Sequence, residues 1–383
     1  MFSLSHLQHI LKPVQAGVFQ RYVDQHQADK YCKRFHCYDL LVGLVYAQLS
    51  HSSSLRVLEG RWNQQPEQHY HLHTGALSRS TLADALERRN PAPFADLAGA
   101  LMQTLQRSLR REARALLHAL DSTGIILKGR GFETYAGNGS GRIDGLKLHL
   151  MINVGGQLPV EQRITSAKVS DISAGREFAI EPGITYAFDK GYCDYAWWAK
   201  IDAAGAFFVT RQKKNAAYAV VETRPASAEH ILSDEVILFP RNRKRSPAYS
   251  QPLRRIVVDR PGKQPLVLVS NQLQTSADEI AEQYRQRWQI ELLFKWFKQH
   301  LKLKTFLGRS ENAVRLQILA ALIAFLLFKR YRDSSPELAA ETLWISLASV
   351  SSNLFLRPLT EYARHKRRQA DCSAAQLRQA GLF

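Results

Sequence analysis

The sequence is poor in cysteine and has no apolar run long enough to cross a membrane. Four cysteines in 383 residues are too few for a disulfide framework and indicate a reducing compartment: Cys32, Cys37, Cys193 and Cys372. The most apolar run, Leu316 to Phe328, has 13 residues, whereas a span needs roughly 20, so we predict a buried helix there. The first residues lack an apolar core with a small-residue cleavage site, and we expect no signal peptide.

Acidic residues are scarce relative to basic ones. Asp and Glu total 34 against 52 for Lys and Arg, which gives a net charge of +18 and a pI of about 9.8. This balance argues against an ordinary acidic or neutral metabolic enzyme and favours a polyanionic partner, most often nucleic acid and sometimes a membrane surface. With 45% apolar and 10% aromatic residues the chain is expected to fold, into about two to three domains.

Internal repeats, low-complexity segments and the Gly-Lys-Ser/Thr ending of a phosphate-binding loop are all missing. Residues 1–110 are predicted to be helical, since apolar side chains recur at helical spacing in Tyr38–Leu49. A short helix at Thr81–Leu86 follows two capping serines. It fits the second helix of a helix-turn-helix motif as well as an ordinary capped surface helix.

Residues 111–210 predict strands of one sheet. Ala115–Leu120 is a short apolar strand that ends at Asp121, and Ile184–Phe188 is another that ends at Asp189. Between them we expect a glycine-rich loop beside the site, a hairpin and a helix, at 129–141, 146–164 and 173–179. Further strand-like runs with basic loops, Arg211–Lys214 and Arg241–Arg245, predict a small β-rich insertion. The remainder is predicted to be helical, with a basic tail at Arg364–Arg368.

The two aspartates that follow these strands are candidate metal ligands. If the strands are neighbours, the two carboxylates converge, and close carboxylates either share a proton or bind a cation. Oxygen ligands suit Mg²⁺ or Mn²⁺ better than zinc. Two such ions can activate water or a 3′-hydroxyl and stabilise the leaving oxygen of a phosphodiester. Strand-end aspartates also commonly cap turns, so this pair alone is a weak indication.

The segment Tyr284 to Lys298 predicts a helix that gathers cations around one carboxylate. At about 100° per residue, five side chains share an arc of roughly 80° beside an apolar face: Tyr284, Arg287, Glu291, Lys295 and Lys298. A row of i,i+4 salt bridges, Arg287–Glu291–Lys295, accounts for three of them. It accounts for neither Tyr284 nor Lys298, so the segment is a candidate site.

The same segment resembles a known family. A Tyr, two residues, an Arg, three residues, a Glu, six residues and a Lys form the pattern of the IS-four family of bacterial insertion-sequence transposases. Tyr284, Arg287, Glu291 and Lys298 match this pattern position for position. The four-residue pattern is specific to the family.

Two shorter motifs and the order of parts support the resemblance. Asp121 in Asp-Ser-Thr and Asp189 in Asp-Lys-Gly-Tyr are similar to the family's two aspartate motifs. Lys147 and His149 fall on the strand that follows the first motif, as in related sequences. Each aspartate motif by itself is unspecific.

The resemblance implies an α/β fold with a ribonuclease H-like catalytic core, interrupted by a β-rich insertion and flanked by helical N-terminal and C-terminal regions. Its parts are expected to be a helical DNA-binding domain (1–110), the first part of the core (111–210), the insertion (211–273), the second part of the core (274–330) and a helical basic C-terminal region (331–383).

The resemblance also implies a reaction and its residues. A catalytic triad would bind two Mg²⁺ or Mn²⁺ ions: Asp121, Asp189 and Glu291. Four residues would grip DNA phosphates near the cut: Tyr284, Arg287, Lys295 and Lys298. The reaction would be hydrolysis of a phosphodiester at the terminal inverted repeat, then attack of the freed 3′-hydroxyl on target DNA. A homodimer acting at the nucleoid in the bacterial cytoplasm, without a membrane, is expected.

Several alternatives stay open at this stage. The chain could be a catalytically silent DNA-binding protein derived from a transposase, or a hydrolytic ribonuclease H-like nuclease. Members that cut through a DNA hairpin hold a flipped base on aromatic side chains, but the insertion has no Trp, which leaves five candidates: Trp197, Trp198, Tyr218, Phe239 and Tyr249. Trp288 and Trp296 are expected to pack in the core more often than to stack on bases. A zinc site is a weaker possibility, from Cys32, Cys37, His36, His69, His71 and His73.

Overall fold

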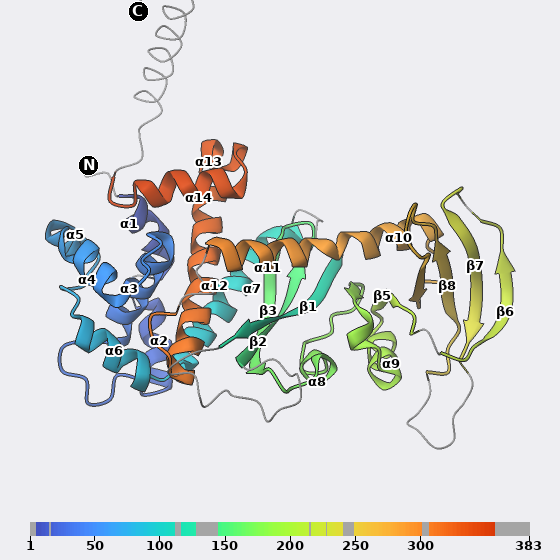
Figure 1. The fold of residues 1–383 in the computed structure, drawn as a ribbon, viewed down its shortest axis with the longest axis horizontal. Coiled ribbons are helices and arrows are strands. Elements are labelled where there is room, and N and C mark those ends of the chain that lie inside the picture. Colours follow the sequence, from blue (N-terminus) through green and yellow to red (C-terminus); the bar gives the residue numbers. More distant parts are fainter. Residues whose placement is uncertain are drawn as a thin grey trace, which may run out of the picture. The chain divides into compact units, whose positions relative to one another are not determined.

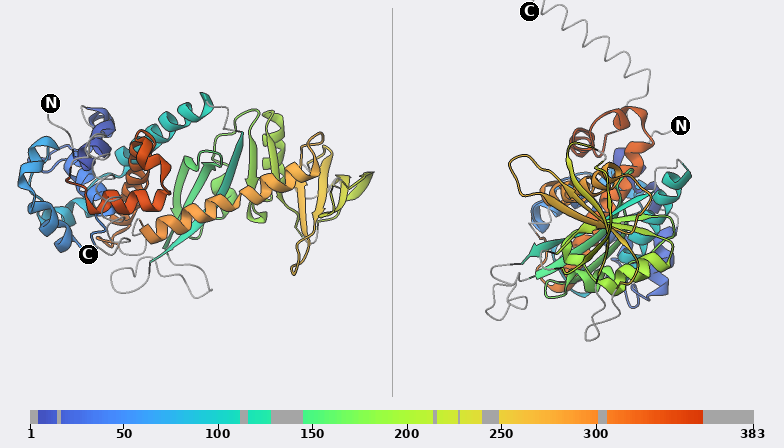
Figure 2. Two further views of the ribbon diagram at one scale, coloured as in Figure 1. Left: turned by 90° about the horizontal axis from the view of Figure 1, so that it is seen from above. Right: turned by 90° about the vertical axis from the view of Figure 1, so that its right-hand side faces the viewer.

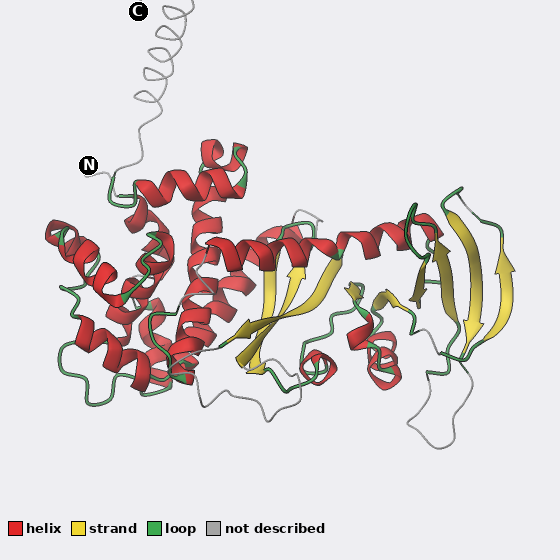
Figure 3. Cartoon of the chain, in the orientation of Figure 1, coloured by secondary structure: helices red, strands yellow, loops and turns green. Residues whose placement is uncertain are grey.

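The computed structural model describes residues 5–14, 17–111, 116–127, 145–213, 216–226, 228–239, 249–300 and 306–356 (Figure 3). Three predicted features lie outside these residues: the glycine-rich stretch 129–141, the basic run Arg241–Arg245 and the basic tail Arg364–Arg368. The chain divides into two compact units, Met1–Leu82 with Leu327–Phe383, and Ala83–Leu326.

The first unit is helical in its described residues, as the sequence predicts. Its helices are α1 (His6–Leu11), α2 (Val18–Gln25), α3 (Cys37–Leu49), α4 (Leu55–Asn63), α5 (Pro66–His71), α13 (Pro336–Ala340) and α14 (Leu343–Ser352). Serine or threonine hydroxyls cap several of them, and Ser54 accepts a hydrogen bond from the Val57 N–H at the start of α4. His69 stacks on the buried Trp62 ring, with centroids 5.1 Å apart. His69 is therefore a core residue.

The second unit is built on one mixed sheet of nine described strands: β1 (Leu117–Ile126), β2 (Gly145–Asn153), β3 (Leu158–Ser166), β4 (Thr185–Phe188), β5 (Phe207–Arg211), β6 (Ala219–Arg224), β7 (Ile231–Leu238), β8 (Leu253–Val258) and β9 (Leu266–Ser270). Their order is β3-β2-β1-β4-β5-β9-β8-β7-β6. The first five form an antiparallel β3-β2-β1 hairpin ladder followed by parallel β4 and β5. This is the arrangement expected of a ribonuclease H-like core.

The β-rich segment after β5 continues this sheet. β9 pairs antiparallel with β5, and β8, β7 and β6 extend the sheet beyond it. The sequence predicted most of these strands but missed β6, because its side chains alternate between polar and apolar only weakly and are nearly all exposed. Strand β6 is the edge of the sheet and has no apolar face to bury.

Helices cover both faces of the sheet (Figure 1). On one face lie α8 (Asp171–Gly175) and α9 (Tyr195–Ala203), whose core includes Leu120 and Phe188. On the other face α10 (Ala277–Gln286) packs on a core that includes Ala187 and Val209. Figure 2 shows the line of α10 and α11 (Trp288–His300) crossing the strands. Because successive strand residues point to opposite faces, the residues after Leu120 and Phe188 point toward α10 and α11.

The predicted helix from Tyr284 to Lys298 is divided between α10 and α11. Arg287 is the residue between them, with helical angles of φ −50° and ψ −29°, so the chain direction is kept. The Ile290 N–H donates to the Arg287 carbonyl three residues back, a tighter turn than in an α-helix. The prediction of one uninterrupted helix from Tyr284 to Lys298 was therefore wrong at Arg287.

The apolar run that ends at Phe328 lies in α12 (Glu311–Asp333). By length and composition alone α12 is sufficient to cross a membrane, yet 83% of its most apolar window is buried inside the protein. The prediction of a buried helix is confirmed. Two further helices, α6 (Arg79–Arg88) and α7 (Ala92–Arg111), come before the first strand in the sequence. Helix α7 packs on β3.

Candidate active site

Asp121 and Asp189 lie at matching positions of neighbouring parallel strands. The register pairs Leu120 of β1 with Phe188 of β4, so the next residue on each strand is an aspartate. Asp189 follows the end of β4, as predicted, but Asp121 does not end its strand, because β1 continues to Ile126 beside β2. The two aspartates therefore occupy matching positions at the point where β4 ends and β1 continues, and the Asp121 side chain is only 21% exposed.

Glu291 on α11 is joined to Asp121 through Arg287. Arg287 Nη1 lies 3.2 Å from Asp121 Oδ2, and Arg287 Nη2 lies 2.6 Å from Glu291 Oε1. The predicted Arg287–Glu291 ion pair is therefore present. Arg287 also contacts Asp121 on β1, which is 166 residues away in the sequence. A surface salt-bridge row does not explain this contact, since the Arg287 side chain is only 11% exposed.

A cavity of about 420 Å³ opens beside these carboxylates. Asp121, Glu291, Lys295 and Lys298 line it, together with Ser122, Thr123, Phe294 and Gln299. Lys295 is exposed, and Lys298 is half-buried. The cavity thus brings two of the three predicted carboxylates and both predicted lysines to one opening.

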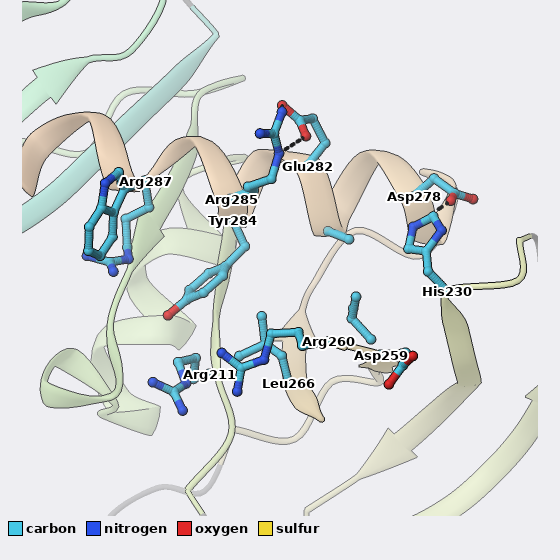
Figure 4. A pocket seen from close by; sticks show the side chains of 13 residues that line it. Arg211, His230, Asp259, Arg260, Leu266, Asp278, Glu282, Tyr284, Arg285 and Arg287 are labelled. Carbon is cyan, nitrogen blue, oxygen red and sulfur yellow. Dashed lines mark hydrogen bonds and ion pairs between the residues drawn. The ribbon is translucent and has the colours of Figure 1, made fainter. Parts of the chain in front are cut away.

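Tyr284 lies in a different cavity, of about 590 Å³, between α10 and the ends of β5, β8 and β9. Figure 4 shows Tyr284 pointing from α10 toward Arg211 and Arg260. The Tyr284 side chain is largely buried, and burial raises the pKa of its hydroxyl, against the opposing charges of Arg287 and Arg211. Arg287 lines this cavity as well and contacts the carboxylates of the other one, so the predicted site residues form two groups that meet at Arg287.

Electrostatics set Asp121 apart from an ordinary surface aspartate. Burial raises the pKa of Asp121 to about 6, and the nearby charges of Asp189 and Glu291 add to the rise. The Ser122 N–H, 2.8 Å from Asp121 Oδ1, and the Arg287 guanidinium oppose it. Mutual repulsion of this kind shows that the Asp189 and Glu291 carboxylates lie close enough to Asp121 to affect its ionisation.

On the other face of the sheet a fourth aspartate supports the first motif. Asp171 Oδ1 accepts hydrogen bonds from the Ser122 hydroxyl at 2.8 Å and from Lys147 Nζ at 3.1 Å. His149 Nδ1 lies 3.9 Å from the same carboxylate, and burial lowers the pKa of His149 to about 4, so it is neutral at pH 7. Sequence reasoning marked Lys147 and His149 but missed Asp171, because a single aspartate at the start of a five-residue helix carries no spacing pattern.

Most aromatic residues considered for base stacking are buried. Trp197, Trp198, Phe239 and Tyr249 are at most 7% exposed and belong to the core under β4 and β5. Stacking a base on them would require that core to open. Tyr218 is exposed at the surface, with the Arg255 guanidinium 4.9 Å from its ring centre.

The two tryptophans of α11 differ in their surroundings. Trp296 packs against Phe297 and Phe325, which confirms the prediction of a core residue. Trp288 is 55% exposed and lines the cavity that contains Tyr284, so the same prediction was wrong there. Trp288 begins α11, immediately after the break at Arg287.

The candidate metal ligands contact other groups of the protein. Within the part of the chain that the structure describes, no three His, Cys, Asp or Glu side chains are arranged to hold a metal ion. The Cys37 thiol donates to the Ala28 carbonyl, and the His69 ring stacks on Trp62 with its Nε2 3.1 Å from the Trp62 carbonyl oxygen, so these two candidate zinc ligands have other contacts. At the carboxylates, the Arg287 guanidinium stands between Asp121 and Glu291, and Asp189 Oδ1 accepts the Gly191 N–H at 2.6 Å.

Comparison with known proteins decides the family. Residues 113–327 match the family model of the transposase DDE domain, and this range contains all seven predicted site residues. The protein y4zB of Sinorhizobium fredii, which carries the name of a transposase, is 43% identical over 254 residues, covering 65% of this chain and 70% of that protein. The chain belongs to the DDE transposase family. It is a DNA transposase of the metal-dependent DDE class.

Shorter matches agree with this assignment. Transposases named for the insertion sequence elements IS5377 of Geobacillus stearothermophilus and IS4SA of Synechocystis are 43% and 46% identical over 68 and 65 residues, or 18% and 17% of this transposase and 18% and 19% of those proteins. The piggyBac transposase synaptic complex with hairpin DNA has a TM-score of 0.44 at 10% identity, over 94% of this chain and 84% of that one. Residues 3–74 match a domain of unknown function, DUF4372.

Proposed function

We propose that this transposase cleaves phosphodiester bonds at the terminal inverted repeats of its own element and joins the freed 3′-hydroxyl ends to target DNA. Asp121, Asp189 and Glu291 are assigned as the ligands of two divalent ions, Mg²⁺ or Mn²⁺. The observation that carries this assignment is the shared cavity, in which Asp121 of β1 and Glu291 of α11 meet beside two lysines. Asp189 does not line this cavity, but it lies at the position that matches Asp121, after the neighbouring parallel strand.

The donor set fits the metals that the family uses. Carboxylate oxygens are the hard ligands that Mg²⁺ and Mn²⁺ prefer. Burial is the main cause of the raised pKa of Asp121, and the nearby Asp189 and Glu291 carboxylates add to it; carboxylates that lie this close together are stabilised by bound cations. When bound, the metals supply an activated hydroxyl nucleophile and stabilise the leaving oxygen. The protein's part is to fix the three carboxylates on a rigid sheet and on the helix packed across it.

The cations around the carboxylates are assigned to DNA phosphates. Lys295 and Lys298 line the same cavity as Asp121 and Glu291, where a phosphate at the cut would lie. Tyr284 and Arg287 belong to the adjoining cavity and would hold the neighbouring phosphate. Positioned cations of this kind stabilise the charge that develops on phosphorus oxygens during in-line displacement.

The wider assembly follows from the reaction. Two element ends are joined in one event, so we propose a homodimer that holds both ends together with the target DNA at the bacterial nucleoid. Cleavage through a DNA hairpin needs an exposed aromatic side chain for the flipped base. Among the residues considered, Tyr218 and Trp288 are exposed, and Trp288 adjoins the proposed phosphate contacts.

The test is cleavage of duplex DNA that carries the element's end, with purified transposase and either Mg²⁺, Mn²⁺ or a chelator. Cleavage is expected only with a divalent metal. Asp121→Ala, Asp189→Ala and Glu291→Ala are each expected to abolish cleavage and to keep DNA binding in a mobility-shift assay. Glu311→Ala is the matched control, because Glu311 also forms an i,i+4 pair with an arginine but lies outside both cavities. Full cleavage by any one of the three triad variants would remove that residue from the assignment.

The products distinguish the remaining alternatives. A nuclease of this fold would release cut ends and never join them, whereas a transposase gives strand-transfer products with a target plasmid. A catalytically silent DNA-binding protein would bind the end and make no nick with any metal.

A further inference from the structure

The guanidinium of Arg287 occupies the place of a cation in the carboxylate centre. It is hydrogen-bonded to Asp121 on one side and to Glu291 on the other, at 3.2 Å and 2.6 Å. Both carboxylates are proposed metal ligands. In the described parts of the chain no three His, Cys, Asp or Glu side chains are arranged to hold a metal. The arginine and a metal ion are thus alternatives at these oxygens.

Arg287 is also placed to reach a DNA phosphate. Its side chain lines the 590 Å³ cavity next to Tyr284, whose ring centre lies 5.5 Å from the guanidinium carbon. Its Nε is buried and makes no hydrogen bond to any described residue. The Nε–H of Arg287 therefore still lacks an acceptor among the described residues, on the side of the guanidinium that does not contact the carboxylates.

Neither the Arg287 guanidinium nor the pair of carboxylates can lose the other's charge without a cost in free energy. Removal of the guanidinium would leave two partly buried carboxylates without a counter-ion, and their side chains are only 21% and 32% exposed. A guanidinium that left the carboxylates would itself need an anion. A divalent cation satisfies the first requirement and a DNA phosphate satisfies the second, so the two events are favourable together.

We propose that Arg287 is the internal counter-ion of the carboxylate centre in the DNA-free transposase. A metal ion displaces its guanidinium from the carboxylates, and the guanidinium then binds a DNA phosphate. The inference rests on the proposed function, since it takes Asp121 and Glu291 as metal ligands. Metal and DNA then bind with positive coupling through one side chain. By linkage, DNA raises metal affinity by the same factor by which metal raises DNA affinity. Metal uptake in the absence of DNA is correspondingly weak, which holds the carboxylate centre inactive away from its substrate.

The test measures Mn²⁺ binding to the full-length protein by electron paramagnetic resonance of free Mn²⁺, without DNA. Arg287→Gln is expected to bind Mn²⁺ at least about tenfold more tightly than the wild type, within the usual range of coupling between sites. Arg315→Gln is the matched control: Arg315 pairs with Glu311 in the same i,i+4 manner and is 29% exposed, but it contacts neither Asp121 nor Glu291. Its Mn²⁺ affinity is expected to equal that of the wild type.

A second variant guards against a folding defect. Arg287→Lys keeps a positive charge but, as a single point donor, bridges two carboxylates less well than a planar fork, so its Mn²⁺ affinity should fall between those of the wild type and Arg287→Gln. Adding duplex DNA with the element's end, after subtraction of Mn²⁺ bound by DNA alone, should tighten Mn²⁺ binding at least about tenfold for the wild type and hardly at all for Arg287→Gln.

The outcomes separate the inference from the proposed function. If wild-type protein binds Mn²⁺ at a site that Asp121→Asn removes, but Arg287→Gln and Arg287→Lys bind it no more tightly, the counter-ion role is overturned and the metal site stands. The role is equally overturned if DNA leaves wild-type Mn²⁺ affinity unchanged. If Asp121→Asn does not alter Mn²⁺ binding with or without DNA, the proposed metal site itself fails, and the inference fails with it.

Discussion

The insertion strands are tied to the start of α10 by one buried ion pair, and breaking it gives a demanding test of the fold. Arg254 of β8 and Asp234 of β7 are paired through two parallel hydrogen bonds, with side chains 5% and 3% exposed. Arg254 Nη1 also donates to the carbonyls of Leu273 and Thr275, each at 3.0 Å. Ser276, the next residue, caps α10. The pair therefore fixes the segment from which the helix with Tyr284 begins.

The expected magnitude follows from this burial. Arg254→Met leaves an ionised Asp234 inside the protein without a partner, a change that costs about 3–5 kcal/mol. For a unit of this size that corresponds to a fall in melting temperature of roughly 6–20 °C. Asp234→Leu should cost about as much, by stranding Arg254. The double variant removes both charges, so its loss should be only about 1–3 kcal/mol, mainly from the Thr275 carbonyl left without a donor, because the Leu273 carbonyl keeps the hydrogen bond from Arg224 Nη1 at 2.6 Å.

The assay combines thermal unfolding by circular dichroism with hydrogen exchange of peptides from β7, β8 and α10. Arg255→Met is the control, because Arg255 neighbours Arg254 and pairs with Glu235 at 2.9 Å. Its ion pair is less buried, with side chains 15% and 20% exposed. We therefore expect a loss of only about 1 kcal/mol in the free energy of unfolding. Faster exchange should appear in α10 for Arg254→Met and not for Arg255→Met. Additive losses in the double variant, or an unchanged α10, would refute the reasoning.

Three further results are expected from the described contacts. At limiting Mg²⁺ the cleavage rate should fall about tenfold from pH 7 to pH 5, because Asp121, with its pKa raised to about 6, gains a proton as the pH falls and then no longer binds metal; a flat profile would contradict this. Lys295→Gln and Lys298→Gln should each reduce the log–log salt slope of DNA binding by nearly one unit, measured by fluorescence anisotropy, and an unchanged slope would place that lysine off the DNA. Asp171→Ala should lower the free energy of unfolding by about 1–3 kcal/mol, since the Ser122 hydroxyl and Lys147 both lose their acceptor, whereas Asp171→Asn should cost less; equal losses would show that the charge alone matters.

The sheet and the carboxylates were predictable to different degrees from the sequence. Apolar runs ending on Asp121 and Asp189 predicted two strands of one sheet without showing that they are neighbours, and the structure pairs these strands in parallel. The hairpin of β2 and β3 was predicted nearly to its ends, because Gly155-Gly156 marks its turn. Local sequence patterns of this kind are sufficient to predict a strand that has one buried face.

Contacts between distant segments were beyond the sequence. The bond from Arg287 to Asp121 depends on how α11 crosses the sheet, which no spacing within residues 284–298 encodes. The break at Arg287 was missed because the residues around it include no glycine or proline, which are the usual signals of an interrupted helix. The roles of the predicted site residues remain predictions that the cleavage and binding experiments test.

The carboxylate centre draws its parts from segments that the ribosome makes at different times. Asp121 and its counter-ion Arg287 are 166 residues apart, a stretch that takes roughly 8–33 s to synthesise in bacteria. During that interval β1 can pair with β2 and β4 while its aspartate still lacks α11. A chain truncated before Arg287 can therefore build much of the sheet and yet lacks both the cation that pairs with Asp121 and the Glu291 carboxylate, so the segment from Arg287 into α11 completes the centre.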